Sequence, residues 1–257
     1  MLSRSLREEF FGLGYAVVPA VVPPGEIACI ASAFDRLEEI GRALDRATTV
    51  GGSLFVIGRA DATRAPRIDR VVWCGAAEPV LLRAGRSPRI LELAAELLGS
   101  DSFDHIINQA HIKSPGDGLS FGWHQDSAHR RYGTDLWRDV NGRGSFVQVI
   151  VAVDPMTREN GALAVVPNTP RLGHVPVDPN GSLPADALTE RDAVLIEADP
   201  GTAVLLHPFA VHASGPNLSR SKRRAFINGF ASPGANHRVY PGAGTGVRLS
   251  IERSTAA

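Results

Sequence analysis

Hydrophobic residues recur at helical spacing in much of the first hundred residues. Pro23, Pro24 and Glu26 are typical of a helix start, and Ile27, Ile30, Phe34 and Leu37 then follow on one face. A second apolar face begins after Ser87-Pro88 and stops at Gly99, a residue suited to a helix end. The elements predicted in this half are helices at 3–12, 23–44 and 87–99 and strands at 15–18 and 54–57.

The pattern changes at about residue 103 to short β-rich runs separated by Gly, Pro, Asn and Asp. Such runs are typical of a β-sandwich or jelly roll. The predicted strands are 103–113, 145–153, 162–167, 202–206 and 224–231. We therefore predict a mainly β protein with flanking helices. Residues 1–257 are expected to form one domain, in which a helical part of about 1–100 packs on a β-core of about 101–235.

Charge and cysteine content narrow the classes of function. The 27 basic residues balance 27 acidic ones, so no overall charge favours binding to nucleic acid or to an anionic membrane. Cys29 and Cys74 are the only cysteines and form no metal-binding motif. No stretch approaches the roughly 20 apolar residues of a membrane span, and the start lacks the apolar run of a signal peptide. A cytoplasmic protein with a small-molecule substrate is the expectation, and the oligomeric state is open.

The segment FGWHQD carries the first candidate ligands. His124 and Asp126 are two residues apart, so in an extended strand both side chains project from the same face. The segment LLHPFAVHASGPN supplies a distant histidine, for which we choose His212. His207 stands at odd spacing from it and is expected on the opposite face, in a structural role.

Two imidazoles and one carboxylate on one face of an iron(II) ion leave three positions open. These positions suffice for a bidentate oxoacid and dioxygen. A structural zinc site would instead close its fourth position with a protein ligand. The pattern therefore predicts a non-haem iron centre formed by His124, Asp126 and His212.

Three motifs in the same order resemble the phytanoyl-CoA dioxygenase family: HQD at 124–126, ENGALAVVP at 159–167 and HASGPNLSRSKRR at 212–224. The opening segment EEFFGLGYAVVPAVVPPGEIA is also similar to that family, whereas residues 46–100 are not diagnostic. The resemblance implies a double-stranded β-helix (a cupin-like jelly roll) with Fe(II) at one mouth of the barrel, and with 2-oxoglutarate and O2 as co-substrates.

The resemblance also implies roles for further residues. Arg223, eleven residues after His212, is the expected partner of the far carboxylate of 2-oxoglutarate, to which a guanidinium can donate two hydrogen bonds. Ser214 is expected to bind the same carboxylate. Gln125 and Lys113 resemble positions that contact the carboxylate nearer the metal, although Gln125 points away in a regular strand. Arg220 and Arg224 are rivals of Arg223.

The chain departs from the family pattern after Val166, where Pro167, Asn168, Thr169 and Pro170 replace the usual turn. Substrate contacts there cannot be transferred from the family. Asp126 is an intact carboxylate, whereas halogenating relatives carry a small residue at that ligand. Hydroxylation of a C–H bond, with release of succinate and CO2, is therefore the expected reaction, and desaturation and cyclisation stay open.

The substrate itself is not predicted by any motif. Candidate contacts are Trp123, His111, Tyr132, Trp137 and His174, although aromatic residues beside a β-core more often serve packing. Arg130 and Arg131 are compatible with an anionic substrate and equally with a solvated loop. The alternative functions are a cupin-like metal hydrolase or isomerase and a non-catalytic small-molecule-binding barrel.

Overall fold

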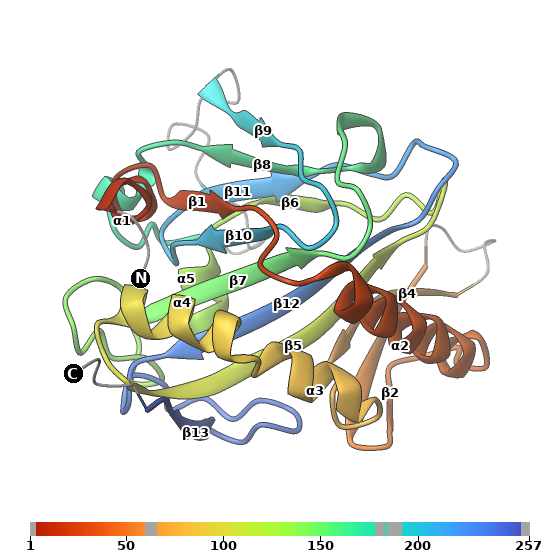
Figure 1. The fold of residues 1–257 in the computed structure, drawn as a ribbon, viewed down its shortest axis with the longest axis horizontal. Coiled ribbons are helices and arrows are strands. Elements are labelled where there is room, and N and C mark those ends of the chain that lie inside the picture. Colours follow the sequence, from red (N-terminus) through yellow and green to blue (C-terminus); the bar gives the residue numbers. More distant parts are fainter. Residues whose placement is uncertain (1–3, 60–65, 178–182, 184–191, 253–257) are drawn as a thin grey trace.

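The computed structural model describes residues 4–59, 66–177, 183 and 192–252. Within these residues the chain forms two antiparallel sheets with helices along one side (Figure 1). The larger sheet has nine strands in the order β1-β10-β7-β12-β5-β4-β3-β2, with β13 also paired to β5. They are β1 (Tyr15–Val18), β2 (Thr48–Val50), β3 (Ser53–Gly58), β4 (Arg67–Val72), β5 (Ser102–Lys113), β7 (Phe146–Ala152), β10 (Ala203–Leu206), β12 (Arg223–Ala231) and β13 (Val247–Ser250).

The smaller sheet has four described strands in the order β6-β11-β8-β9. These are β6 (Phe121–His124), β11 (Val211–Ser214), β8 (Leu163–Val166) and β9 (Val194–Ile196). Each is short, and β11 lies between β6 and β8 with a register that pairs His212 with both His124 and Val165. The smaller sheet thus brings together segments that are almost 90 residues apart in the sequence.

Helices from the first hundred residues cover the face of the larger sheet that is turned away from the smaller one (Figure 1), whereas the short α5 lies beside the cavity between the sheets. The α-helices are α1 (Arg4–Gly12), α2 (Pro24–Arg42), α3 (Pro79–Gly85), α4 (Pro88–Leu98) and α5 (Asp126–Arg130), and two 3-10 turns are η1 (Arg158–Asn160) and η2 (Thr169–Leu172). Helix α2 buries Phe34, whose ring meets that of Phe226 edge-on at 6.4 Å. Helix α4 ends at Gly99, which has a left-handed φ of 70°.

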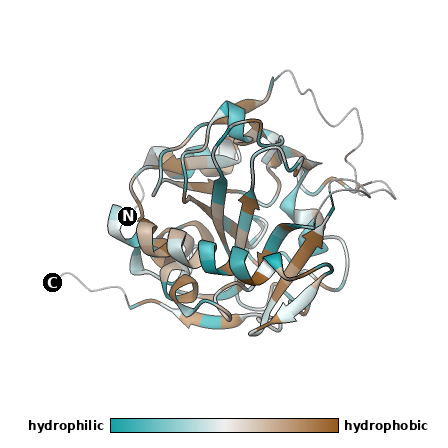
Figure 2. Ribbon diagram, turned by 90° about the vertical axis from the view of Figure 1, so that its right-hand side faces the viewer, coloured by the Kyte–Doolittle hydropathy of each residue, from teal (hydrophilic) through white to brown (hydrophobic). Residues whose placement is uncertain are grey.

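The central strands of the larger sheet are buried on both faces. In β7, Val149 and Val151 pack into the core beneath the helices, whereas Ile150 and Ala152 face the space between the sheets. Because both faces are covered, the run reads as continuously hydrophobic instead of alternating. Figure 2 shows such hydrophobic stretches on the strands inside the molecule, with hydrophilic stretches on the helices.

The sequence predictions of the main elements are confirmed. All five strands predicted after residue 100 are present with bounds within one residue of those expected, as are the three N-terminal helices and the strands at 15–18 and 54–57, with bounds shifted by at most two. The first hundred residues also contribute β2 and β4 to the larger sheet. These two strands, together with β6, β9, β11, β13, α3 and α5, were not predicted. No helix among the described residues is long and apolar enough to cross a membrane.

Candidate metal centre and its cavity

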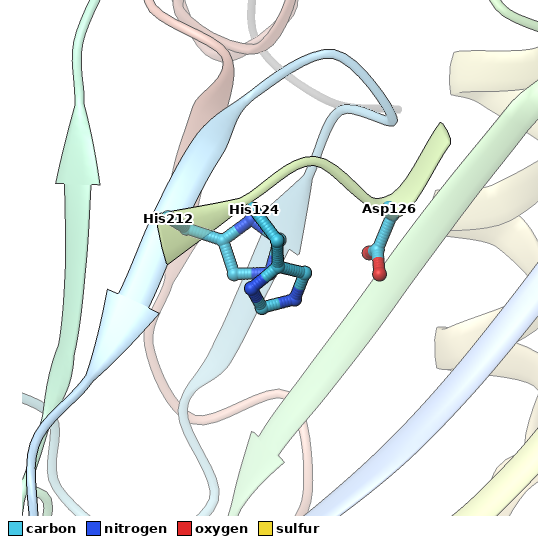
Figure 3. A group of neighbouring side chains, drawn as sticks. All are labelled: His124, Asp126 and His212. Carbon is cyan, nitrogen blue, oxygen red and sulfur yellow. The ribbon is translucent and has the colours of Figure 1, made fainter. Parts of the chain in front are cut away.

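The side chains of His124, Asp126 and His212 converge at the edge of the smaller sheet (Figure 3). One potential ligand atom from each residue lies within 4.8 Å of those of the other two. The two histidines are direct partners across β6 and β11, and their ring centroids are 4.1 Å apart. The strand pairing therefore sets the spacing of two ligands.

Asp126 joins this group although it does not belong to the strand. Strand β6 ends at His124, and Asp126 is the first residue of α5. The intervening Gln125 keeps an extended backbone with φ −110° and ψ 142°. The alternation expected of a strand thus continues for one more residue, and the Asp126 carboxylate points to the same side as the His124 imidazole.

The hydrogen bonds around these residues prepare them as metal ligands. His124 Nδ1 lies 2.7 Å from the carbonyl oxygen of Gly122, and His212 Nδ1 lies 2.9 Å from that of Ala210. A ring that donates through Nδ1 to a carbonyl presents the lone pair of Nε2 to a metal. Asp126 Oδ2 is buried without a hydrogen-bond partner. Two Nε2 atoms and one carboxylate oxygen thus form a donor set that fits iron(II).

The protonation states also suit metal binding. Burial, with the neighbouring His124, lowers the pKa of His212 to about 4, so its imidazole is neutral at pH 7. Burial opposes ionisation of Asp126, but His212, Arg130, His124 and His129 outweigh burial and hold its pKa below the ordinary value. A neutral imidazole and an ionised carboxylate are the forms that bind metals.

A cavity of about 290 Å³ opens beside the three residues, between the two sheets. Its apolar wall includes Ile107, Ile150, Met156, Leu163 and Ile227. Arg223, the first residue of β12, and Ser214, the last residue of β11, also line it. The cavity therefore joins the candidate metal centre to the predicted co-substrate anchor.

The phytanoyl-CoA dioxygenase (PhyH) family model matches residues 12–225, which is most of the chain. The chain belongs to this family. The match includes all three motifs and every residue of the candidate metal centre.

Relatives and solved structures of the same kind support this assignment. The chain is 27% identical over 175 residues to L-proline trans-4-hydroxylase of Streptomyces griseoviridis and 28% identical over 160 residues to a probable alpha-ketoglutarate-dependent hypophosphite dioxygenase of Stutzerimonas stutzeri. Both matches cover 58% of this chain but only 62% and 52% of the relatives. EvdO2 from Micromonospora carbonacea var. aurantiaca, solved with 2-oxoglutarate, superposes with a TM-score of 0.68 at 25% identity, over 94% of this chain and 96% of EvdO2. The predicted double-stranded β-helix is confirmed.

Within this family member, Arg223 is almost fully buried, and its only described hydrogen bond runs from Nη2 to the carbonyl oxygen of Gly161. Its Nε is buried without a partner, and no described carboxylate lies within salt-bridge distance. Burial lowers its pKa to about 10, so the guanidinium keeps its charge at neutral pH. A buried, unpaired guanidinium is costly unless a ligand anion accompanies it.

The rivals of Arg223 point elsewhere. Arg224 forms ion pairs with Asp154 at 2.8 Å and Asp35 at 3.0 Å on the outer side of the sheet, and Arg220 is exposed. Neither lines the cavity. Alternation along β12 explains the difference, because neighbouring strand residues face opposite sides of a sheet.

Lys113 lies directly opposite Arg223 across β5 and β12. Its Nζ donates to the Ser214 carbonyl oxygen at 3.1 Å, to Ser214 Oγ at 2.7 Å and to the carbonyl oxygen of Gly215. Burial, with Arg223, lowers the Lys113 pKa to about 7. Lys113 is not part of the cavity wall and lies behind Ser214, to which it is hydrogen-bonded.

Gln125 does not reach the cavity. Its Nε2 donates to the carbonyl oxygens of Gly173 and Phe209, and its Oε1 accepts from the backbone of Val175 at 2.8 Å. The side chain points away from Asp126, as expected for the residue between two that face the metal. The structure therefore gives no support to a co-substrate contact, and Gln125 instead ties two loops together.

Of the substrate candidates, only His111 lines the cavity. Tyr132 and Trp137 stack at 4.9 Å within the core between the sheets, and Trp123 packs against a small cluster around Val211. His174 Nδ1 bonds Ser127 Oγ at 2.8 Å. These four aromatic side chains contact core and loop residues instead of the cavity.

Several polar residues of the cavity wall were not predicted from the sequence. Gln109, Gln148, Arg70, Arg238 and Tyr240 all face it, together with His129. Arg130, for which the sequence left an anionic substrate and a solvated loop open, also lines the cavity, whereas Arg131 does not. Arg70 and Gln109 come from neighbouring strands, and Arg238 and Tyr240 come from the loop after β12. No local motif marks them, because only the tertiary fold brings them to one place.

Proposed function

We propose that this protein is an Fe(II)- and 2-oxoglutarate-dependent dioxygenase that hydroxylates a C–H bond of a small-molecule metabolite. The observation that carries the proposal is the donor set of His124, Asp126 and His212 beside a cavity that also contains the unpaired Arg223. When bound, iron(II) with O2 and 2-oxoglutarate supplies the oxidation: one oxygen atom enters the C–H bond and the other enters succinate, with release of CO2.

His124, Asp126 and His212 would hold the iron and leave coordination positions free for 2-oxoglutarate and O2. His124 and His212 are fixed by their Nδ1 bonds to backbone carbonyls, so neither ring needs to reorient when the metal binds. The Asp126 carboxylate is buried and ionised before binding. Preorganisation of this kind favours metal affinity.

Arg223 and Ser214 would hold the far carboxylate of 2-oxoglutarate. Arg223 provides donors that lack a protein acceptor, and Ser214 Oγ already accepts from Lys113 Nζ, which leaves its own O–H to donate. A pair of such donors suits a carboxylate. Lys113 acts as a positioning residue because it fixes Ser214 and the neighbouring Gly215 carbonyl.

The apolar wall of the cavity would hold the substrate carbon skeleton and exclude water. By their names, the two relatives act on L-proline and on hypophosphite, which are both small molecules. A cavity of about 290 Å³ suits a substrate of modest size. These observations support a small-molecule substrate.

We infer further that residues 1–257 fold as one domain in the cytoplasm. The helices α2 and α4 share a core with the larger sheet, which argues against an independent N-terminal unit. Cys29 and Cys74 are free thiols, as expected in a reducing compartment. Limited proteolysis tests the first inference, because a separate N-terminal unit would be released as a stable fragment.

Anaerobic titration of iron(II) into the apoprotein with 2-oxoglutarate tests the proposed function. The expected result is a weak visible metal-to-ligand charge-transfer band, followed on admission of O2 by formation of succinate. If the protein binds iron or zinc but the band never forms, the oxygenase proposal fails. A hydrolase with the same ligands would then be the better account.

A further inference from the structure

Positive charge on the cavity wall exceeds what iron and 2-oxoglutarate require. Four arginines line the cavity, namely Arg70, Arg130, Arg223 and Arg238, against one carboxylate, Asp126. The two charges of iron(II) and the two of 2-oxoglutarate cancel, so three positive charges remain in excess on the wall. Since uncompensated charge in a partly buried space is unfavourable, this excess points to a further anion.

Arg130, the last residue of α5, carries this argument furthest. Its side chain is 7% exposed, and Nε and Nη1 are buried without any hydrogen-bond partner. The guanidinium carbon lies 5.3 Å from the ring centre of Phe146 and 5.1 Å from that of Tyr240. The two rings hold the flat group in place and favour its charge, but they accept no hydrogen bond along its N–H edge.

The residues around Arg130 do not pair its buried positive charge. No described carboxylate lies within salt-bridge distance, and it makes no hydrogen bond to Asp126, although its charge lowers the pKa of that residue. The charge of Arg130 thus acts on Asp126 through space and does not use its Nε and Nη1 donors. These buried donors lack an acceptor, which a bound anion would supply.

Neighbouring groups extend the same surface. Arg70, on β4, lines the cavity near enough to Arg130 for their charges to repel, and the charge of Asp69 also acts on it. Among the described residues its guanidinium has no hydrogen-bond or ion-pair partner. Arg238 stacks over Tyr240 at 5.0 Å, and the Tyr240 hydroxyl is buried without a partner. We call Arg70, Arg130, Arg238 and Tyr240 the arginine cluster.

His111, on the same wall, adds no positive charge. Burial lowers its pKa to about 3, so its imidazole is neutral at pH 7 and can still form a hydrogen bond to a ligand. The arginines alone set the sign of the potential inside the cavity.

We propose that the arginine cluster is a second anion subsite, centred on Arg130 and Arg70, that binds an oxyanion of the substrate while Arg223 holds 2-oxoglutarate. The substrate class is a small molecule with a carboxylate or with a phosphate or phosphonate group. That the bound anion belongs to a substrate rests on the proposed function. The anion subsite itself is tested by binding, without turnover. Arginine is suited to both kinds of oxyanion, because its N–H edge can donate two parallel hydrogen bonds.

The test uses small anions that need no matching carbon skeleton. Protein loaded anaerobically with iron(II) and saturating 2-oxoglutarate is heated with increasing acetate or inorganic phosphate, and with acetamide as the uncharged match of acetate. Ligand that binds only the folded state raises the unfolding temperature in a saturable way. The charge-transfer band is recorded in parallel, and it reports whether 2-oxoglutarate stays bound.

The variants are Arg130→Met and Arg70→Met, with Arg36→Met as the matched control. Arg36 is exposed and pairs with Glu78 at 2.7 Å on the helical side of the molecule. Wild type and Arg36→Met are expected to bind acetate or phosphate but not acetamide. Each cavity variant should raise the apparent Kd for the anion at least about tenfold, because it loses a hydrogen bond from a charged donor. Arg130→Lys replaces Arg130→Met if the latter does not fold.

The outcomes separate the two proposals. A wild type that binds neither anion, or variants that bind as wild type does, would overturn the subsite. Loss of the charge-transfer band on anion addition would also overturn it, since the arginines would then belong to the co-substrate site. If the band never forms, the proposed function fails, but saturable, Arg130-dependent anion binding to the metal-free protein would still support the subsite.

Discussion

The metal ligands and the arginine cluster line the same cavity but come from different kinds of structure. His124 and His212 lie on paired strands, and Asp126 follows one of them directly. Arg70 lies on β4, and Arg238 and Tyr240 lie in the loop after β12, so the cluster is assembled from distant segments. The two histidine ligands also have backbone partners that fix them, whereas Arg130 has donors left open. Chemistry common to the family is thus fixed by short motifs, and the choice of substrate depends on the tertiary fold.

The largest expected effect comes from removing a metal ligand, which should suppress turnover but not anion binding at the arginine cluster. Asp126→Ala or His212→Ala removes one of three ligands, so we expect iron affinity and succinate formation to fall by at least about a hundredfold, the upper value for loss of a group that only supports a ligand. Anion binding at the arginine cluster should survive in the metal-free protein. His237→Ala, at an exposed histidine, is the control. Retention of the charge-transfer band in either ligand variant would show that the metal binds elsewhere.

Arg223→Ala tests the boundary between the metal ligands and the cluster. Loss of a charged pair of hydrogen bonds should weaken 2-oxoglutarate binding by about 2–3 kcal/mol, or roughly a hundredfold, with little change in acetate binding. Arg224→Ala is the matched control, because Arg224 is paired with Asp154 on the outer side of the sheet. That control should lower the unfolding temperature and leave the 2-oxoglutarate Kd unchanged. The reverse pattern in the two variants would assign the anchor to Arg224.

The same contrast explains what the sequence could predict. The helices have strong periodicity and β7 has an unbroken apolar run, so the bounds of these elements were predicted closely. Strands β6 and β11 have four residues each and include His, Gly and Ser, so periodicity did not mark them. Their residues were nevertheless predicted, because the metal ligands lie in recognisable motifs. For Arg130 the sequence left two interpretations open, since its burial between Phe146 and Tyr240 depends on tertiary contacts, one of them with a residue 110 positions further along the chain.

Gln125 sharpens the comparison from inside the HQD motif. Its amide pairs with three backbone groups in the loops near Gly173 and Phe209. Gln125→Met should leave these groups unpaired and lower the free energy of unfolding by about 2 kcal/mol, with an unchanged 2-oxoglutarate Kd in the folded protein. Denaturant unfolding and the charge-transfer titration measure the two quantities. Weakened 2-oxoglutarate binding without a change in stability would restore Gln125 as a co-substrate contact.

The smallest effect concerns a histidine outside both groups. His105 is fully buried, its ring stacks on Phe230 at 4.7 Å, and its Nδ1 accepts from Arg86 Nε at 3.3 Å. An acceptor Nδ1 requires a ring that is not fully protonated. Burial, with the charge of Arg86, lowers the His105 pKa from 6.5 to about 3. Between these two values the unfolded chain binds a proton that the folded protein does not, so acid favours unfolding.

His105→Phe keeps the ring stacking and removes this proton. Wild type should lose stability as the pH falls from 7.5 to 5.5, and the variant should lose about 1 kcal/mol less over the same interval, the value for one ionisable group one pH unit below its unfolded pKa. His237→Phe, at the exposed histidine, should lose as much as wild type. Comparing the two pH values within each variant cancels any change in packing. Equal acid losses in His105→Phe and wild type would mean that His105 is protonated in the folded protein, and the Arg86 contact would then have to break on acidification.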